Sequence, residues 1–538
     1  MRAALLFPLL TVCCFGQTPV ILISIDTLRA DHVDAARAPN LASWGTVFTA
    51  AESQVPLTLP SHTALLTSTY PWENHVEENA GAVPAGTVTL ASVLRIHGYR
   101  TSAFIGSIFL EKQLGLDQGF DTYDSPFAFG AFSKLSGEML FAGRGSGYTA
   151  RERRPGALVL RAANQWMAAH KAEPVFVFVH LFDVHQPYPL GNYDAQVTAT
   201  DKLLGTFRQT LKDSGWWDRS LVIVTADHGE GLGDHGESDH GYFIYESTLH
   251  VPLLIHWPEA SPKLPARVEQ PVGLVDVAPS VLEYLKIPQP AAFHGKSFLN
   301  LSPRAVQSES VYARDSFGWS ALRSVRSGSW KYIDAPKPEL YDLSRDPKEL
   351  NNLVKANPAQ ATAMRALLTR PASPAPPTRA VSGDPQRRKE VLQSLGYLAP
   401  GPQGAVRAAA DPKDRLPLLL RYEDALNQMA ARRYDAAIAT FRAILAADPG
   451  NLLARRDLGV ALIEHQDFLK AIPELQQVAA ASPDDYVTRY ELGIANEQAG
   501  LPLQAADQFE LAARLAPEAA QAREALARVR GKRTSGGR

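Results

Sequence analysis

Two buried-strand patterns that lead into aspartate constrain this chain most strongly. The apolar, β-branched runs Val20–Ile25 and Leu221–Thr225 are followed by Asp26 and, one residue further on, by Asp227. Runs of this kind are typical of strands buried on both faces of a parallel sheet. Ligands of open parallel sheets bind just past the carboxyl ends of the strands. The two aspartates therefore predict a metal site at the edge of such a sheet.

The pattern around these runs predicts the fold class. Between residues 20 and about 300, strand-like runs alternate with amphipathic, Ala-rich stretches, which favours a doubly wound α/β domain. Residues 311–343 break into shorter, hairpin-like pieces and predict a small antiparallel sheet appended to the large one. The clearest expected elements are helices at 90–97 and 158–170, a turn and strand at 98–105, and a strand at 175–180.

The residue types at the strand ends indicate which metal is expected. Asp26 and Asp227 offer carboxylate oxygen and His228 offers imidazole nitrogen. This mixture suits zinc or manganese better than calcium, which prefers shells made only of oxygen. A single Asp-His pair is often just a strand-end hydrogen bond, but the second aspartate at an equivalent strand end favours a metal.

A second ion is an open alternative. The polar residues downstream of His228, together with those after the strand at 175–180, could build another site. Its predicted ligands are Asp183, His185, His235 and His240. One or two ions are both compatible with the sequence.

Thr58 is the predicted nucleophile. It lies between Pro56 and Pro60, which can hold a turn, and the chain looks helical from Ser61 onward. A bound metal would activate its otherwise inert hydroxyl and would count Thr58 among its ligands. The exposed amides of a helix start would favour an anionic ester group. From this stretch alone, Thr58 is equally well interpreted as a helix cap.

Five separated stretches resemble the sulfatase family of the alkaline-phosphatase superfamily, over about residues 18–355. They are I-D-T-L-R-A-D at 25–31, T-L-P-S-H-T-A-L-L-T-S-T-Y-P at 58–71, H-L-F-D-V-H-Q-P-Y at 180–188, T-A-D-H-G-E-G-L-G-D-H-G-E at 225–237 and E-L-Y-D-L-S-R-D-P-K-E-L-N-N-L at 339–353. The resemblance implies an alkaline-phosphatase-like fold and hydrolysis of sulfate or phosphate esters through a covalent intermediate on a metal-bound nucleophile.

The resemblance also implies roles for individual residues. Asp26, Asp227 and His228 would hold the metal, and Thr58 would attack. His185 would contact the ester or its leaving group. His240 stands where sulfatases usually carry a lysine beside the sulfate, and it joins Thr58 and His185 as a predicted catalytic residue.

Several positions depart from the family pattern. Sulfatases carry Cys or Ser at the position of Thr58 and oxidise it to formylglycine, whereas oxidised threonine would be a ketone, which hydrates poorly. Thr27 replaces an aspartate, His62 replaces an arginine, and His228 replaces a common asparagine. The Gly-Lys-x-His element reads Gly106-Ser107-Ile108-Phe109.

These departures resemble the phosphodiesterase and phosphoethanolamine-transferase branches. They predict a phosphate mono- or diester substrate rather than a sulfate ester, with Thr58 acting as an alkoxide. A sulfuric ester hydrolase is the alternative, and transfer to an acceptor other than water is open. His62 and Arg29 are expected to support the ligands from behind.

The first 16 residues resemble a secretory signal: one basic residue, a short apolar run and then small residues. Cleavage after Gly16 would leave a mature chain without cysteine, exported to the periplasm or the extracellular space. A lipid anchor on Cys13 is the alternative, since Leu10-Thr11-Val12-Cys13 half-resembles a lipobox. A third interpretation is a buried N-terminal strand with no export. No transmembrane span is predicted, and a net charge of −2 gives no reason to expect nucleic acid as a partner.

A 34-residue repeat occupies the C-terminal part. Pro449, Pro483 and Pro517 keep this spacing, as do Gly459 and Gly493. Such a period is the tetratricopeptide signature, in which small residues let paired helices approach closely. Three repeats over 415–516 and a capping helix to 530 would form an all-α solenoid that binds a protein or peptide. A packing stalk with no partner is the alternative.

The predicted division of the chain is a signal at 1–16, a metallohydrolase domain at 17–369, a Pro/Ala-rich linker with a short helix (386–395) at 370–412, repeats at 413–530 and a disordered tail at 531–538. The expected substrate is a small-molecule, glycan or lipid ester. A rival interpretation is a scaffold protein whose catalytic site has decayed, in which the repeats carry the function.

Overall fold

The computed structural model describes residues 17–79, 81–127, 153–259, 264–369, 410–517 and 520–535. The predicted signal with Cys13, the predicted helix at 386–395 and nearly all of the predicted linker lie outside these residues. In the described part of the chain, no helix combines the length and the apolar character needed to cross a membrane.

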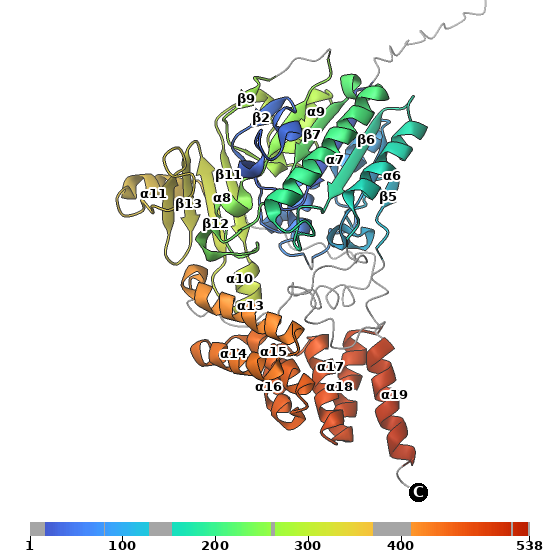
Figure 1. Ribbon diagram of the computed structural model, residues 1–538, viewed down its shortest axis with the longest axis vertical. Helices are drawn as coiled ribbons and strands as arrows, with labels where there is room; N and C mark the ends of the chain where they lie inside the picture. Colours follow the sequence, from blue (N-terminus) through green and yellow to red (C-terminus); the bar gives the residue numbers. More distant parts are fainter. Residues whose placement is uncertain are drawn as a thin grey trace, which may run out of the picture.

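An eight-stranded sheet forms the centre of the larger part of the molecule, in the order β5-β4-β6-β1-β7-β8-β2-β9 (Figure 1). Strand β1 lies between β6 and β7 and runs parallel to both, whereas β8 runs antiparallel to β7 and β2. The strands are β1 (Val20–Ile25), β2 (Thr46–Phe48), β4 (Arg100–Phe104), β5 (Thr122–Asp124), β6 (Val175–Leu181), β7 (Leu221–Thr225), β8 (Leu253–His256) and β9 (Arg267–Val268).

The three central strands are buried along their whole length. Every residue of β1, β6 and β7 is buried, so these strands show no alternation between apolar and polar positions. Burial of each large apolar side chain stabilises the fold by about 1.5–3 kcal/mol, which explains why these runs form the middle of the sheet. The predicted doubly wound α/β domain is confirmed.

The helices of this domain pack against the sheet and against one another. Helices α6 and α7 lie side by side over one face (Figure 1), and α2 packs against α4 and α9. The helices are α1 (Pro39–Ala42), α2 (Thr58–Thr67), α3 (Pro71–Asn74), α4 (Leu90–Ile96), α6 (Gly156–Ala169), α7 (Tyr193–Asp213), α8 (Glu246–Leu249) and α9 (Val277–Tyr284). A two-stranded pairing of β3 (Ala51–Glu52) and β10 (Val272–Gly273) lies outside the large sheet.

A four-stranded antiparallel sheet follows, as predicted, but its first part differs from the prediction. Residues expected to begin a hairpin at 311 form helix α10 (Tyr312–Phe317), which ends at Gly318 with φ 72°. The missing strand lies earlier in the chain, at β11 (Ala305–Ser310). The other strands are β12 (Leu322–Ser327), β13 (Trp330–Asp334) and β14 (Glu339–Asp342), and α11 (Pro358–Arg365) packs on β13.

Seven helices form the C-terminal part. Three antiparallel pairs, α13/α14, α15/α16 and α17/α18, are followed by α19, and each helix packs on the next. Their bounds are α13 (Leu416–Ala430), α14 (Tyr434–Ala447), α15 (Leu452–Glu464), α16 (Phe468–Ala481), α17 (Tyr486–Gln498), α18 (Pro502–Leu515) and α19 (Ala520–Ser535). Helix α19 continues five residues past the predicted end at 530, into the stretch predicted to be disordered.

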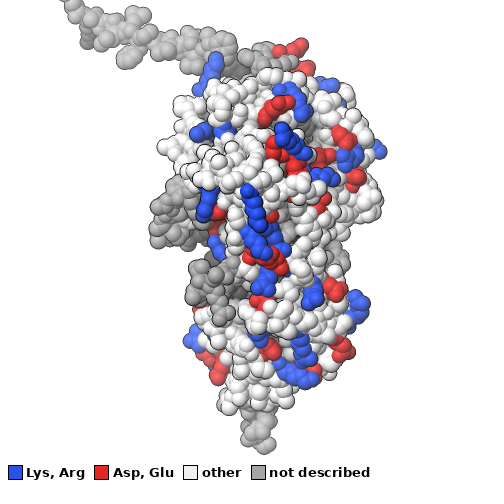
Figure 2. Space-filling model, turned by 90° about the vertical axis from the view of Figure 1, so that its left-hand side faces the viewer, with Lys and Arg blue, Asp and Glu red and all other residues white. Residues whose placement is uncertain are grey.

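The repeated glycines have the packing reason predicted for them. A Cβ atom on Gly459 would lie 2.6 Å from the side chain of Leu475, and one on Gly493 would lie 2.5 Å from the ring of Phe509. The second helix of each pair therefore places a large side chain directly on the backbone of the first. On the face shown in Figure 2, basic and acidic side chains are interspersed along the whole molecule.

A buried cluster of charges joins the small sheet to the large domain. Arg326 contacts Glu52 at 3.0 Å and Glu246 at 2.9 Å, and Lys331 contacts Glu246 at 2.9 Å and Glu349 at 3.1 Å. Lys331 is 0% exposed. Three carboxylates therefore share two cations away from water, and one carboxylate is favoured to remain protonated.

This cluster predicts a pH dependence of stability. Burial raises the pKa of Glu349 to about 8 and that of Glu52 to about 7, from an ordinary value of 4.5. An acid whose pKa is raised by folding binds more protons when folded, so its contribution to stability is complete below the unfolded pKa and is lost as pH rises through the folded one. We therefore expect the free energy of unfolding, and with it the unfolding temperature, to fall between about pH 5 and pH 8. Glu349→Gln should reduce the slope of the free energy of unfolding by up to ~1.4 kcal/mol per pH unit.

Calorimetry of the full chain at several pH values measures the slope. The matched control is Glu259→Gln, since Glu259 is exposed and lies outside the cluster. An unchanged slope in the Glu349→Gln protein would contradict the assignment.

Candidate metal and nucleophile site

The strand-end residues converge as the sequence predicts. Asp26 follows β1 directly and Asp227 lies just past β7, the neighbouring parallel strand. Asp26, Asp227 and His228 offer ligand atoms that all lie within 4.8 Å of one another. These three side chains are 0% exposed, and Thr58 is 1% exposed.

The Thr58 side chain lies beside the carboxyl group of Asp26 and acts to lower the pKa of that acid. Thr58 is the first residue of α2, and the residue that caps this helix is Leu57, with no side-chain hydrogen bond to the helix. The structure therefore places the hydroxyl of Thr58 in the acidic cluster instead of on the amides of its own helix. The interpretation of Thr58 as a helix cap does not describe this arrangement.

The first turn of α2 offers fewer free amides than expected. The Leu59 amide donates to Asn79 Oδ1 at 2.9 Å, and Pro60 has no amide hydrogen. The expected cradle of helix amides around an anionic ester is therefore reduced. Asn79, which the sequence analysis missed, is 0% exposed, and in the described structure its Nδ2 is buried without a hydrogen-bond partner.

The donor set fits a divalent cation. Of the atoms in the described residues, Asp26 Oδ1, Asp227 Oδ2 and His228 Nε2 are buried and have no hydrogen-bond partner. Buried polar atoms are normally paired, so several orphaned donors around one point indicate a ligand. His228 Nδ1–H donates to the Gly229 carbonyl at 2.9 Å, which leaves the Nε2 lone pair for coordination.

The charges of the two acids support the same conclusion. Burial raises the pKa of Asp26 to about 8, and burial together with the charge of Asp26 raises the pKa of Asp227. Two carboxylates in one dry site repel each other unless a cation lies between them. Oxygen from two acids with one imidazole nitrogen is the kind of ligand set that zinc and manganese accept.

Two further histidines, His180 and His62, hydrogen-bond to Asp26 and to the backbone of Thr58. His180 Nε2–H donates to Asp26 Oδ2 at 3.2 Å, and burial lowers the pKa of His180 to about 3, so its ring is neutral. His62 Nδ1–H donates to the Thr58 carbonyl at 2.7 Å, and Ser24 Oγ–H donates to His62 Nε2 at 2.9 Å. His62 thus fastens the start of α2 to β1. The sequence analysis missed His180, which lies within an otherwise apolar strand.

Arg29 ties the two ligand loops together. Its guanidinium donates to the Glu230 carbonyl at 3.1 Å, to Asp31 at 2.8 and 2.9 Å and to Asp234 at 2.8 Å. Asp31 belongs to the loop after β1, whereas Glu230 and Asp234 belong to the loop after β7. This is the supporting place that the sequence predicts for Arg29.

His185 and His240 lie together beside the ligands. Their ring centroids are 5.2 Å apart, and the ring of His240 lies 4.4 Å from that of His228. Burial lowers the pKa of His185 to about 3. Burial also acts to lower the pKa of His240, but the carboxylates of Asp239 (2.8 Å) and Glu230 (3.0 Å) outweigh it and raise that pKa well above its usual value. Of these two rings, that of His185 is therefore neutral and that of His240 is cationic.

The four predicted ligands of a second ion do not come together. Asp183 accepts the Gly156 amide at 2.9 Å at the start of α6. His235 stacks on Tyr245 with centroids 3.6 Å apart and hydrogen-bonds to the Lys348 carbonyl. Only His185 and His240 lie near the first ligand set.

Arg153 is a cation that the sequence analysis did not single out. It forms a β-bridge with Ser107, which stands where the family carries its lysine, and it donates to the Asp183 carbonyl at 2.8 Å and to the Pro187 carbonyl at 3.0 Å. Its guanidinium lies 5.7 Å from the centroid of Phe182, which stacks on His185. No local motif marks Arg153, because it reaches the loop of His185 only through the fold.

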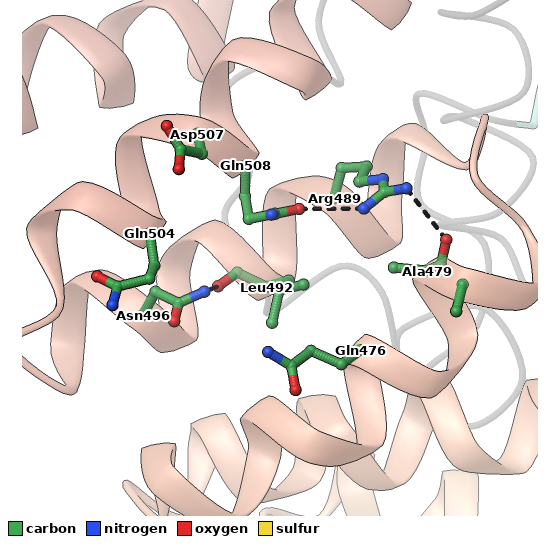
Figure 3. Close-up of a pocket in the computed structure, with 9 residues that line it drawn as sticks. Gln476, Ala479, Arg489, Leu492, Asn496, Gln504, Asp507 and Gln508 are labelled. Carbon is green, nitrogen blue, oxygen red and sulfur yellow. Dashed lines mark hydrogen bonds between the residues drawn. The ribbon is translucent and has the colours of Figure 1, made fainter.

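A separate pocket of about 250 Å³ lies in the repeats, between α16, α17 and α18 (Figure 3). Arg489 crosses it and donates to Gln508 and to the Ala479 carbonyl. Carboxamides of four residues line much of the rest: Gln476, Asn496, Gln504 and Gln508.

A mixed α/β sheet with a buried cluster of carboxylates and histidines at its strand ends defines an alkaline-phosphatase-like class of fold. The sulfatase family profile matches residues 18–287, the profile of the C-terminal part of N-sulphoglucosamine sulphohydrolase matches 233–370, and a tetratricopeptide repeat profile matches 428–485. The chain belongs to the sulfatase family, and the predicted combination with C-terminal tetratricopeptide repeats is confirmed.

Relatives with known names agree with this assignment. Arylsulfatase K of Bos taurus is 32% identical over 182 residues, which are 31% of this chain and only 33% of that protein. An N-acetylgalactosamine-6-O-sulfatase of Bacteroides thetaiotaomicron is 25% identical over 475 residues and covers 66% of this chain and 89% of its own.

Solved structures show the same fold at lower identity. A phosphonate monoester hydrolase of Agrobacterium radiobacter aligns with a TM-score of 0.52 and 19% identity, covering 65% of this chain and 94% of that one. A 2-O GAG sulfatase aligns with a TM-score of 0.51 and 18% identity, covering 65% and 91%. These likenesses confirm the alkaline-phosphatase-like fold.

The donor set predicts metal binding that single substitutions remove. We expect the full-length protein to bind a divalent cation, and Asp227→Asn to weaken binding at least ~10-fold, because it removes one of two anionic ligands. His235→Ala is the control, since His235 faces Lys348. Titration of apo-protein with zinc and manganese, with metal analysis of the loaded protein, measures both. Equal affinity in the Asp227→Asn and wild-type proteins would contradict this ligand set.

Proposed function

We propose that the protein is a metal-dependent hydrolase that cleaves a phosphate ester through Thr58. The observation that carries the proposal is the buried Thr58 side chain beside Asp26, next to a set of ligand atoms that have no hydrogen-bond partner within the described residues. A threonine hydroxyl is a poor nucleophile by itself, and a site of this kind is what activates one.

The nucleophile type favours phosphate over sulfate. An aldehyde hydrate is the attacking group in formylglycine sulfatases, and threonine cannot form one. Thr58 therefore acts as an alkoxide and leaves a phosphothreonine that water hydrolyses. Asp26, Asp227 and His228, with the Thr58 oxygen, would hold the cation. A cation bound there, zinc or manganese, supplies Lewis-acid stabilisation of the alkoxide and of the ester oxygens.

Side chains of the protein attack the phosphorus, assist the leaving group and position the reacting residues. Thr58 Oγ1 attacks phosphorus in line, forming one P–O bond as the bond to the leaving alcohol breaks. The cationic ring of His240 faces the reacting group and provides charge or a proton, and the neutral ring of His185 orients the leaving oxygen. His180 and His62 keep Asp26 and Thr58 in place, and Asn79 offers a further donor.

A sulfate ester is the second candidate substrate. It is favoured by the names of the relatives, since arylsulfatase K and the N-acetylgalactosamine-6-O-sulfatase are both sulfatases. Transfer of the phosphoryl group to an acceptor other than water is a further alternative to hydrolysis. The two reactions are distinguished by whether the phosphoryl group appears as free phosphate or on the acceptor.

Activity of the metal-loaded protein on aryl phosphate, aryl phosphodiester and aryl sulfate decides between the substrates. We expect phosphate ester turnover to exceed sulfate ester turnover, and Thr58→Ala to lower kcat by at least ~10³-fold while metal still binds. Thr58→Ser is the matched control and should retain measurable turnover, because it keeps a hydroxyl. Unchanged turnover in Thr58→Ala would reject the nucleophile, and faster sulfate hydrolysis would reject the phosphate assignment. A protein that binds no metal and cleaves none of the three esters would instead fit the decayed scaffold.

We further propose that the protein is exported and that its repeats bind a protein or peptide partner. The N-terminal pattern supports export, and the polar pocket of α16–α18 supports a partner whose main chain pairs with carboxamides. Fractionation of cells, followed by cross-linking of the wild type and of an Asn496→Ala variant, tests both. Retention inside the cytoplasm would overturn export, and identical cross-links in the two proteins would remove the pocket from partner binding.

A further inference from the structure

The first helix of the repeats lies against the loop that carries His240. Figure 1 shows α13 next to α10, at the end of the larger domain that faces the repeats. The loop in question runs from Gly231 to Tyr242 and is called here the His240 loop. Nothing in the chemistry proposed above uses this contact.

Two side chains of α13 hold two points of the His240 loop. A Cβ atom on Gly236 would lie 2.3 Å from Leu416 Cδ2, so this leucine rests directly on the glycine backbone, whose φ is +81°. Ser238 Oγ–H donates to Glu423 Oε2 at 3.1 Å. Leu416 and Glu423 are about two helical turns apart on α13, so the helix contacts the loop at two separate points along the helix axis.

A chain of aromatic rings extends the contact into the repeats. Tyr242 lies 5.9 Å from Phe317, and Phe317 lies 5.5 Å from Tyr422 of α13. The hydroxyl of Tyr422 donates to Asp457 of α15. Tyr242 and Tyr422 are buried, at 2% and 5% exposure. The end of the loop is thereby packed against the first two repeats.

Hydrogen bonds within the His240 loop connect the residues that contact α13 with the residue that faces the site. The Gly231 amide donates to the Asp239 carbonyl at 2.7 Å, and the Gly233 amide donates to the Glu237 carbonyl at 2.8 Å. The Tyr242 amide donates to Glu237 Oε1 at 2.8 Å. A shift of the loop at Gly236 or Ser238 therefore moves the backbone that presents His240.

We propose that α13 is a positioning element of the active site, in which Leu416 and Glu423 set the place of His240 through the His240 loop. The repeats then form part of the catalytic architecture in addition to any partner they bind. The inference rests on the proposed function for its kinetic consequence, because His240 must contact the reacting group for its place to matter. Misplacement of such a group by about 1 Å lowers turnover by up to ~100-fold.

Leu416→Ala in the full-length, metal-loaded protein tests the inference. The control is Leu420→Ala on the same helix, whose side chain is 44% exposed. We expect Leu416→Ala to lower kcat for the best aryl ester about tenfold with KM within about twofold, and to speed hydrogen exchange in residues 231–242. Leu416→Met should restore both, because it refills the space over Gly236. Leu420→Ala should match the wild type in kcat and in exchange.

Equal kcat or equal exchange in the Leu416→Ala and Leu420→Ala proteins would overturn the proposal. Should Leu416→Ala not fold, the Ser238→Ala and Glu423→Ala variants and their double variant replace it. The two single variants should each lower kcat, and the double variant should be no slower than the worse of them, because both remove one contact. Additive losses would overturn the proposal. A wild-type protein without ester turnover would refute the proposed function, and the hold of α13 on the loop would then be decided by exchange alone.

Discussion

Asp26 and Asp227 place two carboxylates side by side where water does not reach. Each lies at the end of a strand whose every residue is buried, so the sheet that brings them together also removes the solvent that would separate their charges. Much of the surrounding structure compensates for this repulsion. His180 donates to one acid, the backbone amides of Thr27 and His228 donate to the other at 3.2 and 2.8 Å, and the remaining ligand atoms are left for a cation.

The same constraint explains why Thr58, the proposed nucleophile, lies where it does. Thr58 begins a helix whose first turn is held by His62 and Asn79, so its hydroxyl is directed by two buried anchors. Neither anchor is a ligand, and both are buried polar groups whose hydrogen bonds are worth more in a dry site than in water. The arrangement proposed to activate Thr58 thus depends on the distant Asn79 as well as on the neighbouring His62.

Local motifs made part of this arrangement predictable. Asp26 and Asp227 follow apolar runs, Thr58 lies in a Pro-flanked turn, and the glycine and proline spacing predicts the repeats. His180 could not be found in this way, because a histidine within an apolar strand looks like any other core residue. Arg153 and Asn79 act through tertiary contacts that leave no trace in local spacing. Asp183 and His235 were misleading for the opposite reason: their spacing resembles that of ligands, but one caps a helix and the other stacks on Tyr245.

The small antiparallel sheet predicted over 311–343 begins earlier in the chain than expected, because residues 312–317 form a helix. Gly318 adopts a left-handed conformation at the end of α10, which is the common way for a short helix to end. Val311 and Tyr312 favoured a strand by type, but the preceding residues 305–310 supply the β11 strand that pairs with β12. Tertiary pairing therefore outweighed local propensity at this point.

The first two repeats contact the larger domain, through α13 and α15, whereas the polar pocket lies further along the array. Helix α13 is packed on the His240 loop and on the ring of Phe317, whereas the polar pocket is built by α16, α17 and α18, one to two repeats further along. Helix α15 connects the pocket with the larger domain: it packs against α14, α16 and α10, and its Asp457 accepts the hydrogen bond from Tyr422 of α13. A partner that bound at the pocket and altered the curvature of the array would therefore act on the His240 loop through α15 and α13, a coupling that two domains joined by a flexible linker would lack.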